Sequence, residues 1–290
     1  MTTPFRVLVA TDGSAAARAA VTTALRFPWP EGTLADGVVA NQLRAETPAP
    51  LLSSELDKVA EVLAAATTRD LTRRWTDGRT AIVAGSPADV ILMEARRLGA
   101  DVIVVGWRGH GIVRRYLMGS VSRRVVRHAT TNVLVVRRAR TEIRRIVIAF
   151  DGSSQSKRAV DLVARFSVPP KGRITLVTSV DPMFVSLALV PESNRANIER
   201  EVSRVNRERV AQARQALEEP AGALTAAGWS VKRLVTQGEA LTEVLSAVRK
   251  SDADLLVVGV AGQAGDSSPF VGGVADGALN LSTVPVLVVR

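Results

Sequence analysis

The chain alternates short, uninterrupted hydrophobic runs with longer segments in which apolar residues recur every three or four positions. Uninterrupted runs are typical of strands buried on both faces, and the three-to-four spacing is typical of amphipathic helices. The pattern predicts strands at about 6–11, 33–40, 80–84, 102–106 and 133–137, and helices at about 15–26, 54–74, 87–98 and 120–129. Strands that alternate with helices in this way predict an α/β fold with a parallel sheet.

The same order of elements is written twice. Residues 6–14, RVLVATDGS, recur as residues 145–153, RIVIAFDGS, and both copies end on VLVVR. We therefore predict two tandem Rossmann-like domains, 1–140 and 141–290, each a five-stranded parallel sheet flanked by helices. The second copy is longer between its second and third strands, where it contains the uncharged stretch 182–191. Core packing, an interface and a lid all remain open for that stretch.

Composition and charge exclude several kinds of functional site. The net charge is +10 and most of it lies in the first copy, which fits either binding of an anionic partner or a solvated arginine-rich surface. The chain has no cysteine, which excludes disulfides and thiolate metal sites, and its two histidines are too few for a histidine-rich metal site. No apolar stretch approaches the 20 or so residues of a membrane span, and no secretory segment opens the chain. We expect a cytoplasmic protein that does not contact a membrane.

The connection after the strand at 102–106 carries the candidate chemistry. It holds twelve residues between Gly106 and Gly119, where about two to six are usual. Glycines here let backbone amides approach an anion, Ser120 opens a helix whose N-terminus favours anions, and Arg108 adds positive charge. A plain turn with a serine cap and solvated arginines is the alternative. Neither a P-loop nor a dinucleotide fingerprint is present.

With these residues the sequence resembles a tandem universal stress protein over nearly its whole length. The ATP-binding branch of that family carries Gly-x2-Gly-x9-Gly-Ser/Thr after its fourth strand, and Gly106, Gly109, Gly119 and Ser120 fit this spacing. The resemblance implies an adenine nucleotide α-hydrolase-like fold. It also implies that ATP, with or without Mg²⁺, binds chiefly to the first domain.

The resemblance assigns roles by position. Adenine would lie beside Ala10, Thr11, Asp12 and Val39, the ribose and phosphates along Gly106 and Gly109, and the terminal phosphates at Gly119, Ser120 and Val121. The positive charge of Arg108 makes it a further candidate for phosphate binding. Two of these assignments have structural alternatives. Asp12 could instead act on the dipole of the following helix, and Val39 could be a core residue.

The second copy departs from the pattern. Asp151, Gly259, Gly262 and Gly272 keep their places, but Gly273 stands where the family has Ser or Thr. Its loop has no lysine or arginine, and Ser179 is expected opposite Val39. Because hydrogen bonds to charged groups contribute about 1.5–3 kcal/mol each, we expect this second site to be weak or empty.

The resemblance implies an ATP-binding stress-response protein that acts through an unknown protein partner, and no catalytic residue is assigned. A nucleotide-free interaction module and a slow ATP hydrolase remain alternatives, while no recognition helix or aromatic platform favours nucleic-acid binding. The last strands, 133–137 and 285–290, are apolar edges, so we expect the two domains to pair through them. Whether the whole chain forms a homodimer is left open.

Overall fold

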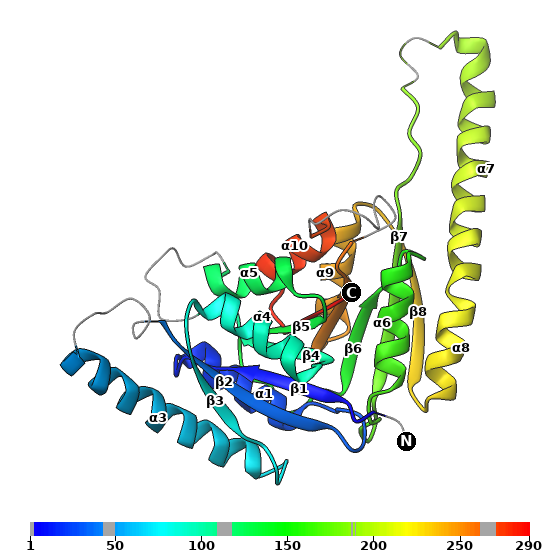
Figure 1. Ribbon diagram of the computed structural model, residues 1–290. Helices are drawn as coiled ribbons and strands as arrows, with labels where there is room; N and C mark the ends of the chain where they lie inside the picture. Colours follow the sequence, from blue (N-terminus) through cyan, green and yellow to red (C-terminus); the bar gives the residue numbers. More distant parts are fainter. Residues whose placement is uncertain (1–2, 43–49, 109–117, 187, 189, 262–270) are drawn as a thin grey trace.

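A ten-stranded β-sheet runs through the protein in the order β3-β2-β1-β4-β5-β10-β9-β6-β7-β8 (Figure 1). The computed structural model describes residues 3–42, 50–108, 118–186, 188, 190–261 and 271–290, with the side chains of 50–53 left out. Each half contributes five parallel strands, and antiparallel pairing of β5 with β10 joins the halves. The predicted α/β class with two tandem Rossmann-like domains is confirmed.

The first half follows the predicted order closely. Its strands are β1 (Arg6–Ala10), β2 (Leu34–Asn41), β3 (Thr80–Ala84), β4 (Val102–Gly106) and β5 (Asn132–Val136). Its helices are α1 (Ala15–Arg26), α3 (Pro50–Thr72), α4 (Pro87–Leu98) and α5 (Ser120–His128). The Ser14 side chain caps α1 by accepting a hydrogen bond from the Ala17 amide at 3.1 Å. Gly99 ends α4 in the left-handed region, at φ +61°, where glycine is favoured.

The second half repeats this arrangement with one extra helix. Its strands are β6 (Arg145–Ala149), β7 (Arg173–Val180), β8 (Ser230–Gln237), β9 (Leu255–Gly259) and β10 (Val286–Val289). Its helices are α6 (Ser154–Ala164), α7 (Glu192–Ala216), α8 (Glu218–Ala226), α9 (Ala240–Lys250) and α10 (Gly273–Leu281). In the sheet, the strand order reverses between β1 and β4 in the first half and between β6 and β9 in the second. Each reversal is a topological switch point.

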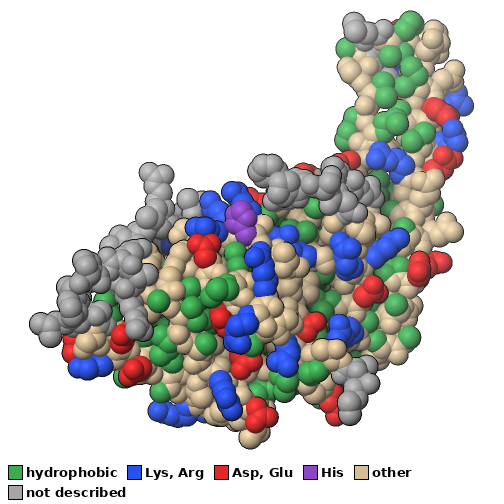
Figure 2. Space-filling model, viewed as in Figure 1, with side chains coloured by type: hydrophobic (Ala, Val, Ile, Leu, Met, Phe, Trp, Pro, Cys, Tyr) green, Lys and Arg blue, Asp and Glu red, His purple; other side chains and the backbone are tan. Residues whose placement is uncertain are grey.

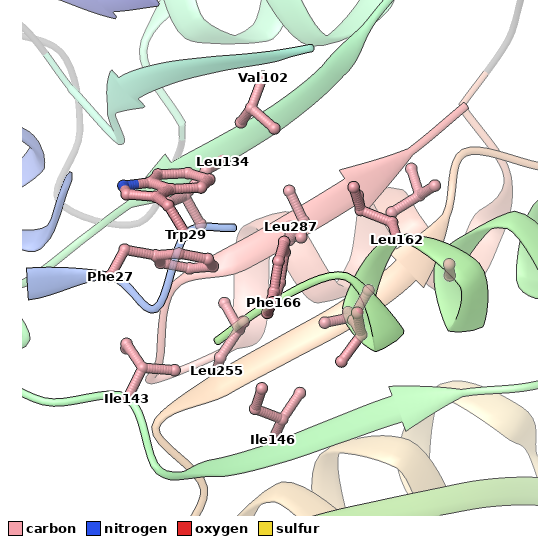
Figure 3. Close-up of a cluster of buried hydrophobic side chains, with 14 of the residues drawn as sticks. Phe27, Trp29, Val102, Leu134, Ile143, Ile146, Leu162, Phe166, Leu255 and Leu287 are labelled. Atoms are coloured by element: carbon pink, nitrogen blue, oxygen red, sulfur yellow. The ribbon is translucent and has the colours of Figure 1, made fainter. Parts of the chain in front are cut away.

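The two halves pack together, because each of the two large clusters of buried side chains contains residues of both halves. Leu134 of β5 lies opposite Leu287 of β10, as expected for domains that pair through their last strands. Phe27 and Trp29 of the first half meet Phe166 of the second, with the rings of Phe27 and Phe166 edge to face at 5.1 Å (Figure 3). Aromatic pairs of this kind stabilise the contact between the domains by more than the area that they bury.

A pair of arginines joins the domains reciprocally. Arg137, just after β5, donates to the carbonyls of Asn280 and Ser282 at the end of α10. Arg290, just after β10, donates to the carbonyls of Val126 and Arg127 at the end of α5. Each guanidinium thus satisfies unpaired carbonyls at the negative end of a helix of the other domain.

Residues 181–216 depart most from the first half. Of these, residues 181–186 and α7 run side by side away from the sheet (Figure 1); we call these two segments the arm. No residue of α7 is buried, and Phe184 is 85% exposed. The described residues of the stretch 182–191 therefore do not pack into the core, which argues against one of its three open interpretations.

Candidate functional site

A cleft lies at the carboxyl ends of β1 and β4, where the strand order of the first half reverses. This is where open α/β sheets bind their ligands. The cleft is open to solvent and encloses about 100 Å³, which is below the range of about 300–1,000 Å³ typical of small-molecule sites. Its lining residues are Ala10, Thr11, Asp12, Ala17, Val38, Ala40, Pro87, Ile91, Val105, Gly106, Arg108, Val121 and Ser122.

The floor of the cleft is apolar and comes from β1, β2, β4 and α4. Val38 and Ala40 of β2 face it, whereas Val39 packs on Ala60 and Ala64 of α3 on the opposite face. Successive side chains of a strand alternate between faces, so a single strand cannot direct all three to the cleft. Val39 therefore lies in the core, as its alternative assignment had it, and its side chain does not line the cleft.

Asp12 and Thr11 form the turn that leads from β1 into α1. The Asp12 carboxylate accepts a hydrogen bond from the Ser14 amide at 2.9 Å, which closes an Asx turn before the helix. Thr11 is buried, and its amide donates to the Val38 carbonyl at 3.0 Å. Asp12 is exposed at the rim of the cleft. Asp12 therefore both stabilises the turn and lies at the rim of the cleft.

Gly106 stands where the first turn of α1 meets the end of β4. A Cβ on Gly106 would lie 2.6 Å from the backbone carbon of Ala16, which is closer than real contacts allow. In the second half, a Cβ on Gly259 would lie 2.8 Å from the Cβ of Gln155. Helix–strand packing therefore requires both glycines, whatever else they contact.

Hydrogen bonds fix both ends of the long loop after β4. The Gly119 amide donates to the Trp107 carbonyl at 2.9 Å, and the Ser122 hydroxyl donates to the Gly106 carbonyl at 2.6 Å. The hydroxyl of Ser14 donates to the Arg108 carbonyl at 3.4 Å. These contacts hold the N-terminus of α5 against the end of β4 and the start of α1.

The first turn of α5 offers amides to an anion. Its N-cap is Gly119, which provides no side-chain cap, so the amides of Ser120, Val121 and Ser122 have no partner within the helix. The Gly119 amide is already bonded to Trp107, so any contact with an anion would fall on the three residues that follow. Val121 and Ser122 line the cleft, whereas Ser120 is exposed beside it.

Positive charge gathers around Trp107, next to the cleft. The guanidinium of Arg108 lies 4.6 Å from the Trp107 ring and that of Arg137 lies 3.7 Å from it. Burial lowers the pKa of Arg137, and the charges of Arg108 and Arg138 lower it further. The Trp107 indole N–H donates to the Leu279 carbonyl at 2.8 Å. Trp107, which lies next to the cleft, therefore also contacts the second domain.

The structure brings six predicted residues to the cleft: Ala10, Thr11, Asp12, Gly106, Arg108 and Val121. Gly119 and Ser120 begin the adjacent helix, and Gly109 lies outside the described residues. Sequence reasoning missed the apolar floor, including Val38, Ala40 and Ile91. Hydrophobic residues carry no motif, and only the register of β2 on β1, which pairs Ala10 with Val38, would have identified two of them.

The equivalent residues of the second half occupy the same local structures. Asp151 accepts hydrogen bonds from the amide and hydroxyl of Ser153, at 3.0 and 2.6 Å, and the Gly272 amide donates to the Val260 carbonyl at 2.7 Å. Gly262 lies outside the described residues.

One expected correspondence between the halves needs correction. Ala149 pairs with Val177 as Ala10 pairs with Val38, so Thr178, not Ser179, stands opposite Val39.

Within the described residues, no group of three or more His, Asp or Glu side chains is placed to hold a metal ion. Over the same residues, no helix combines the length and hydrophobicity needed to cross a membrane.

The fold and the cleft define the class: a duplicated, doubly wound α/β protein with a cleft at a switch point of its sheet. The family model of the universal stress protein family matches residues 5–137 and again residues 142–290. The chain therefore belongs to the universal stress protein family, and it carries two tandem domains of that family.

Solved structures support the fold. A universal stress protein from Archaeoglobus fulgidus DSM 4304 is similar over 98% of this chain and 97% of its own, with a TM-score of 0.64 and 16% identity. A protein of unknown function from Pseudomonas aeruginosa PAO1 is similar over 98% of this chain and 91% of its own, with a TM-score of 0.59 and 15% identity.

Closer sequence similarity is local. A Staphylococcus epidermidis protein described as a universal stress protein is 50% identical over 54 residues, 18% of this chain and 32% of that protein. The match thus spans about a third of the length of this curated relative.

Proposed function

We propose that the first domain binds ATP in the cleft between β1 and β4, and that the protein acts in the cytoplasm as a nucleotide-dependent regulatory binding protein of the stress response. The proposal rests on one observation, which is that three separate parts of the first domain meet at one cleft. The end of β1, Arg108 and the first turn of α5 meet on one cleft at the switch point. The chain also belongs to the universal stress protein family, which is the family that the sequence resembles.

The chemistry of the lining suits the parts of ATP. An apolar floor that includes Val38, Ala40 and Ile91 suits a purine ring. Asp12 at the rim can accept a further hydrogen bond from an exocyclic amine, because a carboxylate has about four lone-pair sites. Arg108 and the amides at the start of α5 suit phosphate oxygens. Mg²⁺ bound to phosphates needs only one or two carboxylates from a protein.

The second domain is proposed to bind nucleotide weakly or not at all. Val260 stands at the position of Trp107, directly after the strand, and Gly273 begins α10 where Ser120 begins α5. The Arg108 position is held by Ala261. The second site therefore lacks the guanidinium that flanks the first cleft.

The test is calorimetric titration of the full chain with ATP, together with mass spectrometry of small molecules released when the freshly purified protein is denatured. We expect one ATP per chain. Ala40→Phe, which fills the floor of the cleft, should weaken binding at least about tenfold, or about 1.4 kcal/mol. Ser179→Phe alters the equivalent position of β7 and should leave binding unchanged; circular dichroism checks that both variants fold.

Three results would contradict the proposal. Wild-type protein that neither retains nor binds ATP would leave a nucleotide-free interaction module. Unchanged binding in Ala40→Phe would place the nucleotide outside this cleft. Binding lost only in Ser179→Phe would place it in the second domain.

A further inference from the structure

In the arm, hydrogen bonds join residues 181–186 to α7. The amide of Met183 donates to the Asn206 side-chain oxygen at 2.8 Å, and the Asn206 side-chain nitrogen donates to the Met183 carbonyl at 3.1 Å. Arg209 donates to the Asp181 carbonyl at 2.7 Å. The extended segment is thereby fixed along one face of α7.

The arm leaves apolar side chains in solvent. Phe184 is 85% exposed, and its neighbours Met183 and Val185 are also exposed. Figure 2 shows hydrophobic side chains along the arm, among charged ones. An adjacent group of exposed apolar side chains on a projecting element is typical of an interaction surface.

A second unpartnered apolar face lies on α3, at the other end of the molecule (Figure 1). Val59 and Val62 are 67% and 71% exposed, and Ala65 and Ala66 continue the same exposed face. The opposite face of α3 packs on β2 through Ala60 and Ala64. The sequence places Val59 and Val62 in the apolar pattern of this helix, but they do not face the sheet.

The two surfaces have complementary charge. Helix α3 carries four acidic residues against two basic ones. Helix α7 carries six arginines against four glutamates, and four of those arginines lie in its second half, with a single glutamate. The acidic side chains of α3 concentrate in its first half, at Glu55, Asp57 and Glu61.

Length and position also match. The two helices have 23 and 25 residues, so they span about 35 and 38 Å at 1.5 Å per residue. Asn206, which holds the segment next to Phe184, lies ten residues before the end of α7, and Ala60 lies ten residues after the start of α3. In an antiparallel arrangement, Phe184 therefore reaches the level of Val59 and Val62. The arginine-rich half of α7 then lies beside the acidic half of α3.

We propose that the arm docks antiparallel on α3 of a second copy of this chain. In a dimer with twofold symmetry each arm meets α3 of the other copy, so the same contact forms twice. The pairing differs from the β5–β10 contact, which lies inside the chain.

The experiment is sedimentation equilibrium of the full chain across micromolar concentrations. Wild type should sediment as a dimer that dissociates in high salt, because the contact includes opposed charges. Phe184→Asp and Val62→Asp should each weaken the dimer at least about tenfold. Leu281→Asp changes an equally apolar side chain, 61% exposed on α10, and should leave the dimer intact.

Mixing the two disrupted variants separates this contact from arm–arm pairing. A mixture of Phe184→Asp and Val62→Asp chains should recover a heterodimer, because one intact arm then meets one intact α3. A monomeric wild type, loss of the dimer in Leu281→Asp, or a Val62→Asp variant that dimerises normally would each overturn the proposal. A mixture of the two variants that stayed monomeric would overturn it as well.

Discussion

The indole of Trp107 allows the contact between the domains to be measured with one small substitution. Trp107 is 7% exposed, and its N–H donates to the Leu279 carbonyl of the other domain at 2.8 Å. Trp107→Phe keeps an aromatic ring under the Arg137 guanidinium but removes the donor. The Leu279 carbonyl is then left buried without this hydrogen bond.

Two effects set the size of the loss. An unsatisfied buried acceptor costs about 1–3 kcal/mol, and the weaker cation–π contact of phenylalanine with Arg137 adds about 0.5–1 kcal/mol. We expect these two effects together to lower the free energy of unfolding by about 1.5–4 kcal/mol, in addition to the cost of the smaller ring, which a control variant has to measure.

Trp229 provides a matched control. It is 2% exposed, and its indole nitrogen is buried without a hydrogen-bond partner among the described residues. Trp229→Phe removes a similar amount of ring but also an unsatisfied donor, so the two effects oppose each other. We expect its stability to stay within about 1 kcal/mol of wild type.

Urea unfolding followed by far-UV circular dichroism measures both variants, with the denaturation midpoint read at unchanged m-value. The reasoning is refuted if Trp229→Phe is as destabilising as Trp107→Phe, because ring size and not the hydrogen bond would then set the cost.

Two further predictions use the glycines and an acidic group. Gly106→Ala should destabilise the protein by several kcal/mol, because the new Cβ would lie 2.6 Å from the Ala16 backbone. Gly222 is exposed within α8 and a Cβ there meets nothing within 4 Å, so Gly222→Ala should stabilise the protein by about 1 kcal/mol. Thermal unfolding measures both variants, and a Gly106→Ala variant as stable as wild type contradicts the packing argument. Burial alone would raise the pKa of Asp254, but hydrogen bonds from Arg145 outweigh it and lower this pKa. The stabilisation by this ion pair is therefore present above the ordinary carboxyl pKa of about 3.9 and is lost as the pH falls through the lowered folded value. Asp254→Asn should reduce stability at pH 7 and flatten the acid limb of a stability-against-pH curve, and an unchanged acid limb would count against the assignment.

Much of the fold follows from local pattern. Buried strands such as 102–106 are uninterrupted apolar runs, and Ser14 marks the start of α1, so the sequence predicts these elements within a few residues of their bounds. It does not predict the arm, because the sequence shows only a longer connection between the second and third strands of the second copy. A helical pattern does not indicate what the helix packs against.

The candidate site divides in the same way. Asp12 and Arg108, which the sequence predicts as nucleotide contacts, both line the cleft, and the contact itself stays a prediction. The resemblance places Val39 beside adenine, with a core position as the alternative, whereas the side chains of Val38 and Ala40 line the cleft; a shift of one residue along a strand exchanges its two faces. Register depends on pairing between strands distant in sequence, so motif spacing does not determine it.

The antiparallel contact of β5 with β10 has a consequence for the linkage of the halves. Residues 137–144 turn an encounter between two separate domains into an intramolecular one. A short flexible linker already gives an effective concentration on the order of millimolar, and this connection is fixed further by Ile143, which is 2% exposed in the core. Dilution therefore cannot separate the halves. Cutting that connection would make their association depend on protein concentration, and the arginines that reach across, Arg137 and Arg290, would then act between separate molecules.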